Sequence, residues 1–190
     1  MATASAPIAR PAAPKGWLAT FFVMAIMLGI VVGGVVAAGS VASLPDKPPT
    51  LAGGVTVPVP PGWTFEGRTS DRTLLLLSRG NASVAIGVEE NSSPTAALEK
   101  LRNEWAALGT VTVGDIAAVT DVRTDGKATA RFAYSGTFPG EDGSGTVEGE
   151  VTGVQGSNNL AVVFDAWSSE GDFLRARDDV TNIIRGTTIP

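Results

Sequence analysis

The hydrophobic and polar positions divide the chain into an N-terminal apolar stretch and a longer part of mixed pattern. No charged residue lies between Lys15 and Asp46, and the apolar core of that gap is the 25-residue stretch 18–42. As a helix it would span about 37 Å, more than the roughly 30 Å of a bilayer's hydrocarbon core. The stretch has no polar face, which argues against a buried core helix. The pattern predicts a transmembrane helix at 16–42 that contacts membrane lipid through 18–42.

The charges beside this helix predict its orientation. Arg10 and Lys15 precede it, whereas the first two charges beyond it are of opposite sign and cancel. Basic flanks stay in the cytoplasm, so the larger part of the chain is expected outside, with the helix as a signal-anchor. The chain is therefore expected to comprise a cytoplasmic tail (1–15), the transmembrane helix (16–42), a Pro/Gly linker (43–54) and an extracytoplasmic α+β domain (55–190).

A cleaved signal peptide is the alternative to a retained anchor. The apolar stretch ends in Ser40-Val41-Ala42, in which a small residue stands on each side of Val41. Signal peptidases accept this pattern. The apolar region of a signal peptide is typically about 7–15 residues, however, and this one is longer. Retention is the favoured interpretation, and cleavage would give a secreted domain.

Small residues recur at every fourth position of the predicted helix. Ala25, Gly29, Gly33 and Ala37 would form one stripe, and Gly29 and Gly33 make a GxxxG sequence. Such stripes allow two membrane helices to approach closely. The stripe is a candidate helix–helix interface, although ordinary small-residue content is the favoured explanation.

The remaining pattern predicts strands and two helices. Ser93 is expected to cap the first helix, Pro94 to occupy its first turn and Gly109 to end it. Ser168 or Ser169 is expected to cap the second, whose apolar positions run from 173 to 184. Asp125-Gly126 is typical of a two-residue hairpin turn. Strands are predicted from apolar runs or alternation at 55–59, 73–78, 84–88, 129–135, 146–152 and 160–167.

Hairpin-linked strands with two long helices indicate the α+β class, a central antiparallel sheet with helices packed on it. Four consecutive leucines at 74–77 and the apolar run 160–164 lack alternation. Strands of that kind are usually covered on both faces, and the second is expected to be central.

The opening of the domain, Val57-Pro58-Val59-Pro60-Pro61-Gly62-Trp63, resembles the strand and Pro-Gly-Trp start of the PsbP-like fold. That group includes actinobacterial LpqN-type envelope lipoproteins. The resemblance implies an α/β/α sandwich and a mostly non-enzymatic role in binding or assembly, and it transfers no catalytic residue. The lipoproteins carry a lipidated Cys, whereas this chain has no Cys and a predicted helix in its place.

Composition removes several chemistries. The chain has neither Cys nor His, which excludes thiol nucleophiles, Ser-His dyads and nearly all zinc sites. Residues 55–190 contain 18 acidic and 11 basic side chains. Such a surface repels nucleic acid, so nucleic acid is not an expected partner. No cofactor or metal is expected.

The remaining candidate sites are weak. Glu148 and Glu150 share one strand face and could serve as a carboxylate pair for glycoside hydrolysis, although a solvated strand face explains them better. Trp63 follows the Pro-Gly turn and is the aromatic residue most expected on a binding surface. The acids Asp121, Asp125, Glu141 and Asp142 lack the spacing of a calcium-binding loop. Ser144 lacks the flanking spacing of a nucleophile elbow. Asn81 and Asn91 are only formal glycosylation acceptors.

These observations favour a membrane-anchored, extracytoplasmic binding or accessory protein of a bacterial cell envelope, non-enzymatic, with a protein partner that the sequence does not identify. A carboxylate-dependent hydrolase, a secreted binding domain and a sensor that signals through helix dimerisation are the alternatives.

Overall fold

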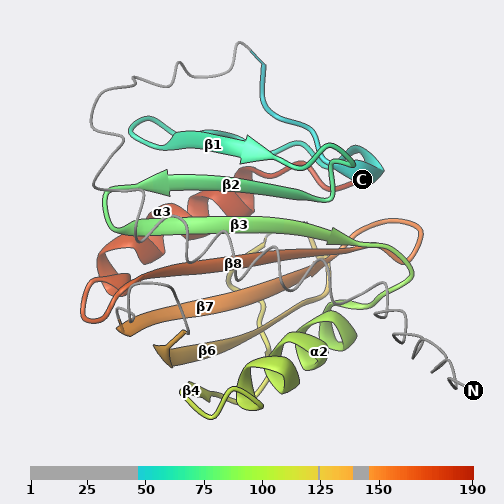
Figure 1. Ribbon diagram of the computed structural model, residues 1–190. Coiled ribbons are helices and arrows are strands. Elements are labelled where there is room, and N and C mark those ends of the chain that lie inside the picture. The colour runs from blue at the N-terminus through green and yellow to red at the C-terminus, as the bar shows by residue number, and fades with distance from the viewer. Residues whose placement is uncertain (1–46, 124, 139–145) are drawn as a thin grey trace, which may run out of the picture.

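The computed structural model describes residues 47–123, 125–138 and 146–190, which form one antiparallel sheet with a helix on each face (Figure 1). Within these residues, no helix has the length and apolar character to cross a membrane. The predicted transmembrane helix at 16–42 lies outside the described part of the chain. The strands are β1 (Thr64–Arg68), β2 (Leu74–Arg79), β3 (Ala82–Glu89), β4 (Val111–Val113), β5 (Ala117–Ala118), β6 (Thr129–Thr137), β7 (Thr146–Gln155) and β8 (Ala161–Ser169).

The strands are arranged in the order β1-β2-β3-β8-β7-β6-β4, with β5 pairing to β6 beside β4. Strand β8 therefore lies in the middle, antiparallel to β3 on one side and to β7 on the other. Its residues 161–168 are all buried. The prediction of a central strand at 160–167 is confirmed.

The two helices cover different parts of the sheet. Helix α3 (Phe173–Gly186) packs on β8 and β3, and helix α2 (Pro94–Ala106) packs on the opposite face over β7, β4, β6 and β8. In Figure 1, α3 lies behind the sheet and α2 in front of its lower half. The predicted α+β architecture is therefore confirmed for the described residues.

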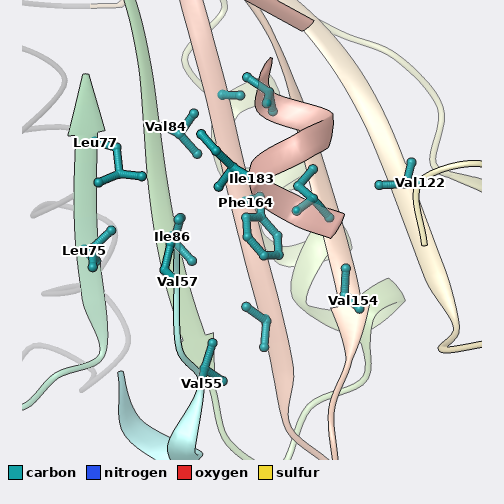
Figure 2. Close-up of a cluster of buried hydrophobic side chains, with 14 of the residues drawn as sticks. Val55, Val57, Leu75, Leu77, Val84, Ile86, Val122, Val154, Phe164 and Ile183 are labelled. Carbon is teal, nitrogen blue, oxygen red and sulfur yellow. The ribbon is translucent and has the colours of Figure 1, made fainter. Parts of the chain in front are cut away.

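The leucine run shows how one strand contributes to two cores. Leu75 and Leu77 face α3, whereas Leu74 and Leu76 belong to the core on the α2 side. This follows from the two-residue period of a strand. Figure 2 shows the α3-side core, where Leu75 and Leu77 lie in the same cluster as Phe164 of β8 and Ile183 of α3.

The beginning and end of α2 follow the sequence prediction. The Ser93 hydroxyl accepts a hydrogen bond from the Ala96 N–H at 3.2 Å, and Pro94 is the first helical residue. This bond satisfies one of the donors that a helix start leaves free. Gly109, just beyond the helix, has a φ of +70°, a conformation that favours glycine.

The predicted strand at 55–59 is wrong. Thr56 forms only isolated bridges, to Thr50 and to Thr188, while Val55 and Val57 are fully buried. The prolines at 58, 60 and 61 lack the N–H groups that would extend a ladder. The alternation of apolar residues therefore reflects burial of one side of this segment, which does not pair as a strand.

The packed domain also starts before the boundary expected at residue 55. Leu51 is 2% exposed and belongs to the α3-side core, and η1 (Ala52–Gly54) follows it as a short 3₁₀ helix. The Val57 N–H donates to the Pro49 carbonyl at 3.0 Å. Residues 49–54, which the sequence places in the linker, are thus part of the described fold.

Asp125-Gly126 does not form the predicted two-residue hairpin. It lies in a longer connection between β5 and β6, closed by a hydrogen bond from the Val119 N–H to the Thr129 carbonyl. Arg123 in this connection pairs with Asp125 and donates to the Ile184 carbonyl at 2.8 Å. A tertiary contact with the end of α3 therefore determines the course of this loop.

Candidate binding groove

The α3 side of β6 and β7 is open beside the helix. Because α3 packs on β8 and β3, a groove of about 440 Å³ remains between its first turn and strands β7, β6 and β4. Two cross-strand rows form its floor: Thr112, Ser135 and Glu148 in one, Ala133 and Glu150 in the other. The side chains of Thr112, Ala133 and Ser135 are small and leave the space above them unfilled.

Glu148 on β7 holds the start of α3. Its Oε1 accepts hydrogen bonds from the N–H groups of Gly171 at 3.0 Å and Phe173 at 2.9 Å. A carboxylate is favourable there because the first N–H groups of a helix are unpaired and carry partial positive charge. Asp172, at the N-cap, makes no side-chain cap bond. The predicted caps Ser168 and Ser169 are wrong, since both residues lie in β8.

Glu150, two residues along β7, is held by two arginines. It accepts from Arg131 of β6 at 3.3 Å and from Arg177 of α3 at 3.1 Å, and its side chain is 15% exposed. The groove therefore contains two carboxylates on one strand face, as the sequence predicts, but each is engaged with its own partners. One holds the helix start, and the other joins β6, β7 and α3.

Leu174 gives the groove an apolar rim. It is 76% exposed, which makes it the one exposed large hydrophobic residue in the part of the chain that the structure describes. Its neighbour Phe173 also lines the groove, although that ring is buried. Leu174 is not among the candidate residues predicted from the sequence. A signal was present, because Leu174 falls outside the inward-facing series Phe173, Ala176, Val180, Ile183 and Ile184.

Trp63 lies inside the domain rather than on its surface. The structure buries its side chain in the α3-side core, 3% exposed, so the expectation of a partly exposed ring is wrong. The Pro60-Pro61-Gly62 turn, closed by the Trp63 N–H bonding the Pro60 carbonyl at 3.1 Å, turns the ring inward. The Arg79 guanidinium covers it, 5.5 Å from the ring centroid.

Among the described carboxylates, Asp165 on the α2 side of the sheet has the most strongly shifted pKa. It is 4% exposed, and its Oδ1 accepts a 2.8 Å hydrogen bond from the Tyr134 hydroxyl. Burial raises the pKa of Asp165 to about 7, and the tyrosine bond partly opposes that rise. A charged residue inside an otherwise apolar run was the sequence signal for it.

The other sequence candidates remain dispersed. The described residues contain no group of three acidic side chains that could hold a metal ion. Asp125 is paired with Arg123, whose hydrogen bond lowers the pKa of Asp125. Outside the described residues lie Glu141, Asp142 and Ser144, together with the helix stripe Ala25, Gly29, Gly33 and Ala37.

Sequence comparison finds no family model and no curated protein that matches the chain. Similar solved structures exist. The cyanobacterial PsbP (CyanoP) of Synechocystis sp. PCC 6803 has a TM-score of 0.53 and 10% identity, and the match covers 80% of this chain and 99% of that one.

Two further structures are more distant. LpqN, involved in cell envelope biogenesis of Mycobacterium tuberculosis, has a TM-score of 0.49 and 18% identity, covering 72% of this chain and 83% of that one. The Ran-binding protein Mog1p of Saccharomyces cerevisiae has a TM-score of 0.45 and 16% identity, with 73% and 85% covered. At such identities a likeness indicates fold alone. The match to CyanoP, together with the antiparallel sheet of this chain, shows that the described domain has the PsbP-like fold.

Proposed function

We propose that this chain is a membrane-anchored, extracytoplasmic protein of a bacterial cell envelope and that its domain binds a protein partner through the groove beside α3. The observation that carries the proposal is the open floor of β6 and β7 next to the exposed Leu174. Exposed apolar side chains at the edge of a concave surface are typical of interaction sites. The apolar stretch at 18–42 supports the anchoring.

A binding role accounts for the groove better than hydrolysis does. A carboxylate acid or base must be able to reach a substrate and exchange a proton with it. Glu148 is committed to the N–H groups that begin α3, and Glu150 to Arg131 and Arg177. Asp165, the carboxylate with the raised pKa, lies in the α2-side layer and therefore across the sheet from both.

Photo-crosslinking from within the groove tests the binding role. A photoreactive residue at Ser135, which is exposed on the groove floor, is compared with one at Glu99 on the exposed side of α2. We expect the full-length chain in its native membrane to give a defined adduct from Ser135 and none from Glu99. Leu174→Ser should weaken the adduct several-fold without unfolding the domain, because an exposed side chain contributes little to stability. Equal labelling from both positions, or an adduct indifferent to Leu174→Ser, would contradict the proposal.

Cell fractionation with intact-mass measurement tests the anchor separately. A membrane-bound product that retains residues 1–42 is the expected result. A soluble product that begins near Ser43 would support signal cleavage and the secreted alternative. The crosslinking comparison is carried out on whichever form is found, so the two tests can fail independently.

A further inference from the structure

The buried pair Tyr134 and Asp165 joins two strands that are not neighbours. Tyr134 is on β6 and Asp165 on β8, with β7 between them. Gly149 of β7 lies opposite Tyr134, and a Cβ there would come within 2.6 Å of the tyrosine ring. The ring therefore crosses β7 where that strand has no side chain, and its hydroxyl bonds Asp165 at 2.8 Å.

One carboxylate oxygen of this pair has no partner. The Oδ2 atom of Asp165 is buried and makes no hydrogen bond in the structure. A neutral carboxyl can occupy such a position at moderate cost, whereas an ionised one loses most of its hydration without compensation. The arrangement fits the protonated acid.

Helix α2 closes over this position. Trp105 of α2 packs edge-on against Tyr134, with ring centroids 4.5 Å apart. The other buried side chains of α2, those of Pro94, Ala97 and Leu98, are uncharged. The neighbours of Asp165 on the flanking strands are Ala85 of β3 and Val151 of β7.

Apart from Glu104, the charged groups on the surrounding elements have other partners or face elsewhere. On α2, Lys100 pairs with Glu89 of β3 and Arg102 with Asp115. Glu99 is exposed, and Glu104, beside Trp105 in the sequence, has a buried Oε2 without a partner. The acids Glu148 and Glu150 of β7 and the base Arg131 of β6 lie on the α3 side, where they form the groove contacts described above.

We propose that Asp165 is a pH-sensitive latch for helix α2, which closes on the sheet when Asp165 is protonated and loosens when Asp165 loses its proton. The strand cannot yield, because β8 is hydrogen-bonded on both sides. Helix α2 joins the sheet by side-chain packing, so it is the element that can move to admit water. Burial raises the pKa of Asp165 to about 7, which sets the pH of the transition near neutrality.

Hydrogen exchange of the full-length chain tests the latch. Amide protection is measured at about pH 5.5 and about pH 8.5, corrected for the intrinsic pH dependence of exchange, and α2 is compared with α3. We expect α2 to lose protection by about tenfold or more at the higher pH while α3 changes little. Asp165→Asn, which mimics the neutral acid, should abolish the difference, and the exposed Asp178→Asn should preserve it. An equal pH response in wild type and Asp165→Asn would overturn the proposal.

Direct titration of Asp165 in the wild-type chain tests the latch even if Asp165→Asn fails to fold. The carboxyl carbon-13 resonance of Asp165 in the wild-type chain should titrate well above the ordinary range for aspartate, with a midpoint near neutrality. Tyr134→Phe removes the one donor to the carboxylate and should move this midpoint to higher pH. A midpoint near 4 in the wild type would refute the latch.

Discussion

Glu148 on β7 accepts a hydrogen bond from the backbone N–H of Phe173, at 2.9 Å, and so supplies from a strand the cap that α3 lacks in its own sequence. The same oxygen accepts from the Gly171 N–H. Glu148 therefore helps to fix the position of the α3 start relative to β7. That start forms one wall of the groove, so stability and groove shape are coupled here.

Replacing Glu148 should destabilise the domain. Glu148→Ala removes both the acceptor and the charge at the helix start, and we expect a loss of about 1–2 kcal/mol in the free energy of unfolding. Glu148→Gln keeps an acceptor oxygen and should cost less. Chemical denaturation measures both, with the exposed Glu90→Ala as control. Equal stability of Glu148→Ala and the control would show that the bond contributes nothing.

Gly149 should not tolerate a side chain. A Cβ there would lie 2.3 Å from the Ala166 carbonyl oxygen and 2.6 Å from the Tyr134 ring, so Gly149→Ala requires backbone movement. We expect a cost of about 1–3 kcal/mol or failure to fold. Gly87→Ala on β3 is the matched strand control, since its Cβ would have no atom nearer than 3.9 Å. Thermal unfolding compares the two, and a Gly149→Ala protein as stable as Gly87→Ala would be inconsistent with the structure.

Stability should depend on pH in two opposite ways. The pKa of Asp165 is raised from its ordinary value of 3.8 to about 7 in the folded domain. Its contribution to the free energy of unfolding is therefore fully present below pH 3.8 and is lost as the pH rises to about 7. This loss is on the order of 2–4 kcal/mol across that range. The pKa of Asp125 is lowered by its bond to Arg123, so its contribution is lost on acidification through its folded pKa.

The free energy of unfolding is thus expected to peak in mildly acidic solution. Denaturant titrations at a series of pH values measure the profile. Asp165→Asn should flatten the limb toward neutral pH, and Asp125→Asn should reduce only the acid limb. A wild-type profile that rises steadily from about pH 4 to about pH 8 would contradict the assignment to Asp165.

Arg123 is expected to be important for the end of α3. Its side chain is 8% exposed, and it donates to the carbonyls of Ile184 at 2.8 Å and Thr187 at 2.9 Å while pairing with Asp125. Arg123→Ala leaves these acceptors without that donor and should cost about 1–3 kcal/mol. Arg123→Lys should recover only part of the loss, because one ammonium cannot reproduce the planar fork. Full rescue by lysine would indicate that charge alone matters.

The sequence predicts the parts of the fold that depend on local rules. The cap at Ser93, the two-faced leucine strand and the central strand β8 follow from side-chain periodicity and helix-end chemistry. The errors arise where distant segments meet. Leu51 is buried by the α3-side core, Trp63 is covered by Arg79, and α3 begins where Glu148 from another element can bond it.

The roles of the groove residues also depend on contacts between segments that are distant in the sequence. Glu148 and Glu150 are predicted on one strand face, which is correct, but their roles depend on where α3 lies above β7. No periodicity reveals that Arg177 of α3 and Arg131 of β6 share one carboxylate. The sequence marks Asp165 only as a charge in an apolar run. Its raised pKa comes from a sheet order that brings Tyr134 across Gly149.

The predicted membrane helix offers a separate test, because self-association would make the anchor part of the binding function. If the small-residue stripe is an interface, Gly29→Ile with Gly33→Ile should abolish close helix packing, since bulky side chains keep the backbones apart. Val31→Ile with Val35→Ile, on the other side of the helix, is the matched control. Proximity labelling between two tagged copies in membranes measures association. Loss of signal with the glycine pair alone assigns the interface. A signal unchanged by the glycine pair means that the stripe is not an interface and reflects ordinary helix composition.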